Sequence, residues 1–167
     1  FENAMRYASG DVIFLSDQDD IWLPNRVQKS LSEIDKGSQC ILLNNTVIND
    51  QREVLIPSYF KWSKPSRSWI RFILRCFYQG ASMAFTRDIK DMSLNFPNVF
   101  PISHDHWIAC VAWTHGKNIS FIDEPYLLYR RHGNNVSPSG EKSKNSLYFK
   151  ISYRFNLFFQ YLNSFRR

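Results

Sequence analysis

The stretch Val12-Ile13-Phe14-Leu15-Ser16-Asp17-Gln18-Asp19-Asp20 contains the transition on which the fold prediction depends. An apolar run is followed at once by three carboxylates, which predicts a buried strand that ends in an exposed loop. In α/β proteins, ligands bind beyond the carboxyl ends of such strands. The three Asp side chains are therefore candidates for holding a ligand or an ion.

Carboxylates packed this closely repel one another unless a cation lies among them. Oxygen ligands at a strand end favour a hard divalent ion that also contacts phosphate oxygens, namely Mg²⁺ or Mn²⁺. The alternative is a solvated acidic turn in which Asp19 or Asp20 caps the next helix. The residues of this loop leave both interpretations open.

Predicted helices and strands alternate along the rest of the chain. Residues 1–9 have the pattern of the last turns of a helix, and Pro24 predicts the start of another. That second helix carries Val27, Leu31 and Ile34 on one face and ends at Gly37. Further helices are predicted at residues 69–76, 104–114 and 146–165, and further strands at 40–48, 82–85, 119–122 and 126–129. This order predicts an α/β domain with a mainly parallel sheet.

Composition limits the protein classes to which the chain can belong. Its 167 residues suffice for one domain, and 44% of them are hydrophobic. Cys40, Cys76 and Cys110 are far apart, so we expect reduced, buried thiols in a cytoplasmic protein. No apolar run is long enough to span a bilayer. The chain begins with Phe1 inside a helical pattern, so we expect that a segment on its N-terminal side is missing.

Four spaced motifs resemble those of family-2 glycosyltransferases with the GT-A fold, especially the rhamnosyltransferase-like members. They are SDQDDIWLPNRV at residues 16–27, QGASMAFTR at 79–87, HDHW at 104–107 and YRRHGNNVS at 129–137. The resemblance covers residues 10–137 and lacks the family's first, nucleotide-binding strands. It implies an N-terminally truncated, GT-A-like three-layer α/β domain. Residues 1–143 would form its catalytic part, and residues 144–167 an amphipathic, aromatic-rich basic helix.

The resemblance also implies roles for individual residues. Asp17 contacts the donor nucleotide, Asp19 holds Mg²⁺ or Mn²⁺ with His132 as a further ligand, and Asp105 is the general base. Gly80 and Arg130 lie beside the donor, whereas His104 and Trp107 lie on the acceptor side. Each has a simpler alternative: Asp105 caps its helix, Gly80 forms an ordinary turn, Trp107 is a core aromatic and His132 is a surface histidine.

The implied function is the transfer of a sugar, with rhamnose as the candidate, in cell-surface polysaccharide synthesis. The partners are then a nucleotide-sugar donor and a saccharide or lipid-linked acceptor, with no nucleic acid. The C-terminal helix is expected to contact the inner face of the plasma membrane, since aromatic and basic residues alternate in it. Three alternatives remain: an inactive truncated fragment, a haloacid-dehalogenase-type phosphatase, and a basic nucleic-acid-binding module.

Overall fold

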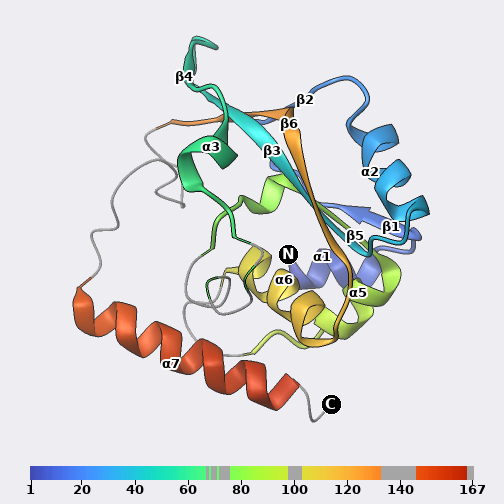
Figure 1. The fold of residues 1–167 in the computed structure, drawn as a ribbon, viewed down its shortest axis with the longest axis vertical. Coiled ribbons are helices and arrows are strands. Elements are labelled where there is room, and N and C mark those ends of the chain that lie inside the picture. Colours follow the sequence, from blue (N-terminus) through green and yellow to red (C-terminus); the bar gives the residue numbers. More distant parts are fainter. Residues whose placement is uncertain (67, 69–70, 72–75, 98–102, 133–145, 165–167) are drawn as a thin grey trace.

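The computed structural model describes residues 1–66, 68, 71, 76–97, 103–132 and 146–164. Strands and helices alternate in this part of the chain (Figure 1). They are α1 (Glu2–Tyr7), β1 (Val12–Phe14), β2 (Ile21–Trp22), α2 (Arg26–Asp35), β3 (Cys40–Ile48), β4 (Val54–Ile56), α3 (Tyr59–Ser63), the 3-10 turn η1 (Gly80–Ser82), β5 (Met83–Thr86), α5 (Arg87–Ser93), α6 (His104–Thr114), β6 (Ile119–Arg130) and α7 (Leu147–Ser164).

The described strands form one sheet in the order β1-β5-β3-β6-β2, with β4 paired to β3. The α/β class is confirmed, but the sheet is not mainly parallel. Only β3 and β6 pair in parallel, and the other four pairings are antiparallel. The reason is that β5 lies between β1 and β3 and runs against both. As a result β1, β3 and β6 still point in one direction, so their carboxyl ends lie at one edge.

Helices cover both faces of the sheet, which gives the expected three layers. The alternation of β3 sends Cys40 and Leu42 into the larger core, together with side chains from α1, α3, α5 and α6. Ile41 and Leu43 point to the other face, where Ile34 of α2 packs beside them. The larger core therefore lies on the face that α6 covers, and α2 forms the opposite layer.

Helix α2 buries a face that shares only Ile34 with the predicted one. It begins at Arg26, after Asn25 with a φ of 66°, and ends before Gly37 with a φ of 96°. Its buried residues are Arg26 and Ser30, whereas Val27 and Leu31 are exposed. The prediction was wrong because the Arg26 guanidinium finds backbone carbonyl acceptors inside the protein, which an apolar side chain cannot use.

Other elements agree with the prediction to different degrees. Strand β3 and helix α6 have the predicted bounds. Residues 119–122 and 126–129 belong to the single strand β6, because a register shift opposite Asn44 accommodates Asp123 and Glu124 without ending the strand. The strand predicted at 82–85 is β5, one residue later and after η1. The helix predicted at 69–76 lies mostly outside the described residues.

Helix α7 lies beside α6 at the periphery, away from the sheet (Figure 1). Tyr153 faces the body of the protein, and its hydroxyl lies 3.0 Å from His106 Nδ1. The exposed apolar side chains recur at helical intervals and form one surface, here called the α7 stripe: Tyr148, Ile151, Phe155, Phe158, Phe159 and Leu162. None of the described helices is long and apolar enough to cross a membrane.

The three cysteines are free thiols, as predicted. Cys40 and Cys110 are buried, but Cys76 is only half-buried. Burial raises the pKa of Cys40 to about 12. A thiol with such a pKa stays protonated and unreactive at neutral pH, so Cys40 is a core residue.

Candidate functional site

The shared direction of β1, β3 and β6 brings two of the sequence motifs together. The acidic loop after β1 crosses the edge of the sheet and enters β2, which pairs with the end of β6. Asp19 Oδ2 then lies 3.0 Å from His132 Nε2, just beyond β6. The backbone N–H of Arg130 donates to Asp20 Oδ1 at 2.9 Å. The first half of the site therefore consists of Asp19, Asp20, Arg130 and His132.

Arg130 holds the acidic loop rather than pointing away from it. Its Nε donates to the carbonyl of Asp19 at 3.0 Å, and its Nη1 donates to the carbonyl of Asp50 at 3.3 Å. The side chain therefore connects the acidic loop to the turn after β3. Its positive charge lies at the expected edge of the sheet, where an anionic donor would meet it.

The second half of the site lies where η1 meets the start of α6. Gly80 is packed so tightly that an added Cβ would lie 2.5 Å from His104 Nε2 and 3.2 Å from Asp105 Cβ. A side chain at position 80 would therefore collide with the two candidate residues. Asp17 interacts electrostatically with both His104 and Asp105, which joins this half to the acidic loop.

Burial and mutual repulsion change the protonation of the acidic loop. The pKa of Asp17 is raised, first by burial and then by the negative charges of Asp19 and Asp105. Burial is also the main reason why the pKa of Asp20 rises to about 7, with further contributions from Asp17 and Asp19. A cation bound among these carboxylates would relieve the repulsion.

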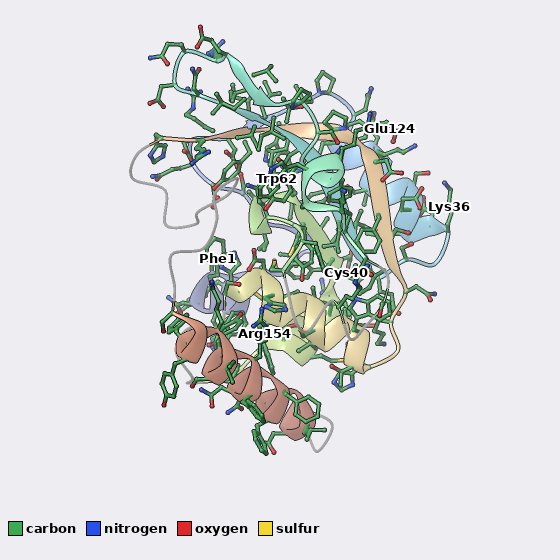
Figure 2. All side chains as sticks on the ribbon, turned by 60° about the vertical axis from the view of Figure 1, so that its left-hand side comes forward. Phe1, Lys36, Cys40, Trp62, Glu124 and Arg154 are labelled. Atoms are coloured by element: carbon green, nitrogen blue, oxygen red, sulfur yellow. The ribbon has the colours of Figure 1, made fainter. Side chains whose placement is uncertain are left out.

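His104 is a half-buried imidazole with one ring nitrogen facing the Gly80 backbone. Burial lowers its pKa, although Asp105 and Asp17 act in the opposite direction. Its Nε2 is buried and makes no hydrogen bond to the described residues. The ring of Phe1 stacks on it at a centroid distance of 3.5 Å, and Figure 2 shows Phe1 next to the start of α6. The stacked Phe1 ring and the close contact with Gly80 therefore hold the His104 ring in place.

Asp105 lies in the first turn of α6 and is half-buried. Its Oδ1 accepts the backbone N–H of His106 at 2.8 Å, and the Cys76 thiol lies 4.0 Å from its Oδ2. One oxygen thus binds an N–H of the first turn, which is a structural role at the helix start, although the N-cap residue of α6 is Ser103 and not Asp105. Among the described residues, the other oxygen has only the weak Cys76 thiol donor nearby, so it can accept a further hydrogen bond.

Trp107 does not join the other candidates. It is buried, and its Nε1 donates to the carbonyl of Ser93 at the end of α5, 3.0 Å away. This placement favours the core-aromatic alternative. Two surface hollows of the described residues also lie elsewhere. One is between α5, α6 and α7, and the other is beside Trp62 and Glu124, which Figure 2 labels.

The residues present fit a Mg²⁺ or Mn²⁺ site in which substrate phosphates and water complete the coordination. Among the described residues, no three His, Cys, Asp or Glu side chains come together as a complete metal cage. Mg²⁺ in nucleotide enzymes typically uses one or two carboxylates together with substrate phosphates and water. Asp19 supplies such a carboxylate, with His132 as a nitrogen donor 3.0 Å away. The pKa of the nearby Asp17 is raised first by burial and then by the negative charge of Asp19.

Arg26 and Asn45 support the site and were missed by the sequence analysis. Arg26 donates to the carbonyls of Leu15 and Ala81, and Asn45 Nδ2 donates to the hydroxyl of Ser82 in η1. The sequence could have indicated that Arg26 is buried. It stands four residues before the small polar Ser30, so the two residues share one face of the helix. Asn45 gave no signal, since its partner comes from a distant part of the chain.

Comparisons with known proteins give the family of this chain. Residues 1–92 match the family described as glycosyl transferase family 2. An uncharacterized glycosyltransferase from Nostoc sp. is 25% identical over 179 residues, which cover 99% of this chain and 53% of the relative. The chain thus spans about half the length of that relative.

A solved structure shares the fold. Residues 1–349 of TarS from S. aureus align with a TM-score of 0.55 and 19% identity, over 77% of this chain and 38% of that one. This likeness bears out the expected GT-A-like α/β fold. The matched family also decides against the phosphatase alternative, because its match includes the acidic loop on which that alternative depended. The chain therefore belongs to glycosyl transferase family 2.

Proposed function

We propose that this chain forms the catalytic part of an enzyme that transfers a sugar from a nucleotide-diphosphate donor to a saccharide or lipid-linked acceptor. The observation that carries the proposal is the meeting of Asp17, Gly80, His104 and Asp105 beside the Asp19–His132 pair. Three motifs far apart in the sequence contribute to this cluster. A structural role for each residue separately does not account for their convergence at one edge of the sheet.

In the proposed reaction, Asp105 accepts the proton of an acceptor hydroxyl while that oxygen attacks the anomeric carbon of the donor sugar. The bond between the anomeric carbon and the diphosphate oxygen breaks on the opposite face, so the configuration is inverted. Asp17 orients the donor, and the absence of a side chain at Gly80 leaves room for His104 and Asp105 to pack against this turn. Mg²⁺ or Mn²⁺ held by Asp19 and His132 would neutralise negative charge on the departing nucleoside diphosphate.

The test is transfer from a panel of nucleotide sugars, including a nucleotide-rhamnose, to acceptors from bacterial polysaccharides such as lipopolysaccharide. Proton NMR of the product reports the anomeric configuration. Asp105→Asn keeps the size of the side chain and an acceptor for the His106 N–H. A base role predicts a fall of about 100-fold or more in transfer with donor binding retained. Turnover near that of the unchanged chain would return Asp105 to the capping role.

Absence of transfer with intact donor binding would support the alternative of an inactive fragment. Retention of configuration in the product would contradict the inverting reaction while leaving sugar transfer in place. The two parts of the proposal are therefore tested separately, one by turnover and the other by stereochemistry.

We further propose that α7 contacts the inner face of the plasma membrane, where a lipid-linked acceptor would be found. The α7 stripe presents aromatic side chains to solvent, and Phe155 is 62% exposed. The helix contains Lys150 and Arg154 and no acidic residue. Each basic residue near an anionic surface contributes about 1 kcal/mol. Arg154 is half-buried on the side of α7 that faces α6 (Figure 2), so the α7 stripe is expected to make the main contact.

A further inference from the structure

Arg26 is among the largest fully buried side chains of the described residues, with 1% of its surface exposed. Its Nη2 donates to the carbonyl of Leu15 at 3.2 Å and to the carbonyl of Ala81 at 2.6 Å. The guanidinium also lies over the Trp22 ring, 4.0 Å from the ring centroid. One nitrogen atom thus joins two backbone segments that are distant in the sequence.

These two segments lead to the two halves of the candidate site. Leu15 comes immediately before the acidic loop that carries Asp17. Ala81 is the middle residue of η1, next to Gly80, which packs against His104 and Asp105. The Arg26 contacts add to the backbone hydrogen bond from the Leu15 N–H to the Met83 carbonyl, 3.1 Å long, in connecting the donor side of the site with the side that carries the candidate base.

The charge of Arg26 is costly at this position. Burial lowers its pKa to about 10, so the side chain stays protonated at neutral pH, and the negative charge of Asp20 favours this form. Its Nε and Nη1 are buried and make no hydrogen bond to the described residues. A linear apolar side chain would fill the same space without the desolvation cost of a charge. Packing alone therefore does not explain an arginine here, whereas hydrogen bonds to two carbonyls do.

We propose that Arg26 is a positioning residue, which holds the acidic loop at a fixed distance from η1 and so sets the separation between Asp17 and Asp105. The part of this proposal that concerns geometry involves only the acidic loop and η1. Its consequence for donor binding rests on the proposed function. Arg26 is too deeply buried to touch a substrate, so it acts through Leu15 and Ala81.

The experiment compares Arg26→Met, Arg26→Lys and the control Ser30→Ala in the full chain by hydrogen exchange and calorimetry. Met keeps the linear stem but donates no hydrogen bond, whereas Lys keeps the charge and donates without the planar fork. Ser30 is buried one turn later on α2, and its hydroxyl donates to the carbonyl of Arg26. Ser30→Ala therefore removes a hydrogen bond within α2 and changes no contact to the acidic loop or to η1.

Arg26→Met is expected to accelerate exchange about tenfold in residues 15–20 and 80–83, because a charged hydrogen bond to each segment is lost. Ser30→Ala is expected to accelerate exchange only within α2. Unchanged exchange in the two loops of folded Arg26→Met would overturn the proposal, as would the same loop exchange in Ser30→Ala. If Arg26→Met does not fold, the same comparison is made with Arg26→Lys.

Calorimetry with UDP, GDP or dTDP and Mn²⁺ separates this inference from the proposed function. Arg26→Met is expected to bind about tenfold more weakly, with part of the affinity restored by Arg26→Lys and all of it kept by Ser30→Ala. If the unchanged chain binds none of these nucleotides, the proposed function fails and the exchange data still decide the role of Arg26. If the unchanged chain and Arg26→Met bind equally, the positioning role fails alone.

Discussion

Asp19 and His132 approach each other at the end of β6, with Oδ2 and Nε2 3.0 Å apart. If the pair holds a divalent ion, Asp19→Asn should remove metal-dependent binding of a nucleoside diphosphate, because an amide is a weaker ligand than a carboxylate. Isothermal titration with UDP, GDP or dTDP and Mn²⁺ measures this. The fold should persist, since the Asp19 side chain is partly exposed.

Asp35→Asn is a suitable control for that experiment, because Asp35 ends α2 and lies outside the candidate site. It removes the same charge from the chain without changing the loop. Equal metal-dependent binding by Asp19→Asn and the unchanged chain would contradict the ligand role. Weaker binding in both variants would assign the effect to net charge instead.

Asp20 gives the protein a pH-dependent stability with a definite sign. Its pKa in the folded chain is raised to about 7 from an ordinary value of 3.8, so the folded state binds this proton more tightly than the unfolded state. The resulting stabilisation is complete below about pH 4 and is lost as the pH rises through about 7. Urea unfolding without divalent metal should therefore give a lower free energy of unfolding at about pH 8 than at about pH 5.

Asp20→Asn should reduce this difference, because an amide does not titrate and can still accept the Arg130 N–H. The free energy of unfolding should still fall somewhat as the pH rises, since the pKa of Asp17 is raised as well. An unchanged slope in Asp20→Asn would show that another group causes the pH dependence.

At the scale of single elements, the sequence predicts long apolar segments well and short or polar ones poorly. Strand β3 and helix α6 have the predicted bounds because their apolar residues, buried almost throughout, are bounded by Gly37 and Gly116 with positive φ. Of the face predicted for helix α2, only Ile34 packs against the core, whereas Val27 and Leu31 are exposed. The burial of Arg26 depends on Leu15 and Ala81, and a helical pattern contains no information about such partners.

The α7 stripe leads to a prediction for this one helix. Phe155→Ser combined with Phe159→Ser should reduce flotation with anionic phosphatidylglycerol vesicles, because both side chains are exposed and apolar. Removal of each aromatic ring costs about 1.5–3 kcal/mol of burial in the interface. Asn156→Ser combined with Asn163→Ser alters exposed polar positions of the same helix and should leave flotation unchanged.

A salt series and a chain ending at Ser143 complete that experiment. Binding that depends on Lys150 and Arg154 should weaken as ionic strength rises. If the unchanged chain and the shortened chain both stay with the soluble fraction at low salt, the membrane proposal is wrong. The stripe would then belong to an interface with protein.

At the scale of the whole molecule, β3 is the central strand on which both the core and the position of the site depend. Leu42 is completely buried in the larger core, and its strand pairs with β4, β5 and β6. Leu42→Ala should lower the free energy of unfolding by about 2–5 kcal/mol, as measured by urea denaturation. The exposed Val54→Ala should change it by about 0.5 kcal/mol or less. Similar losses in both variants would mean that the core is not organised around β3.

The convergence of the site could be predicted, whereas the arrangement of the sheet could not. The carboxyl end of a strand predicted a ligand site at Asp19, and the family resemblance added His132 to it. The two side chains do lie together, because β1 and β6 share a direction. The antiparallel insertion of β5 between β1 and β3 depends on pairing between distant segments. Periodicity within a segment indicates that it is a strand but not the direction of its neighbour.

Gly80 and His104 are in such close contact that their evolution is expected to be linked. A methyl group at position 80 would lie 2.5 Å from His104 Nε2, and the Phe1 ring, stacked on the imidazole, restricts the positions that the imidazole can take. A lineage that acquires alanine at position 80 must therefore reduce or redirect the side chain at position 104. The two positions should covary among homologues, with bulk at one of them excluding bulk at the other. This constraint is steric, so it should hold even in lineages that have changed the donor sugar.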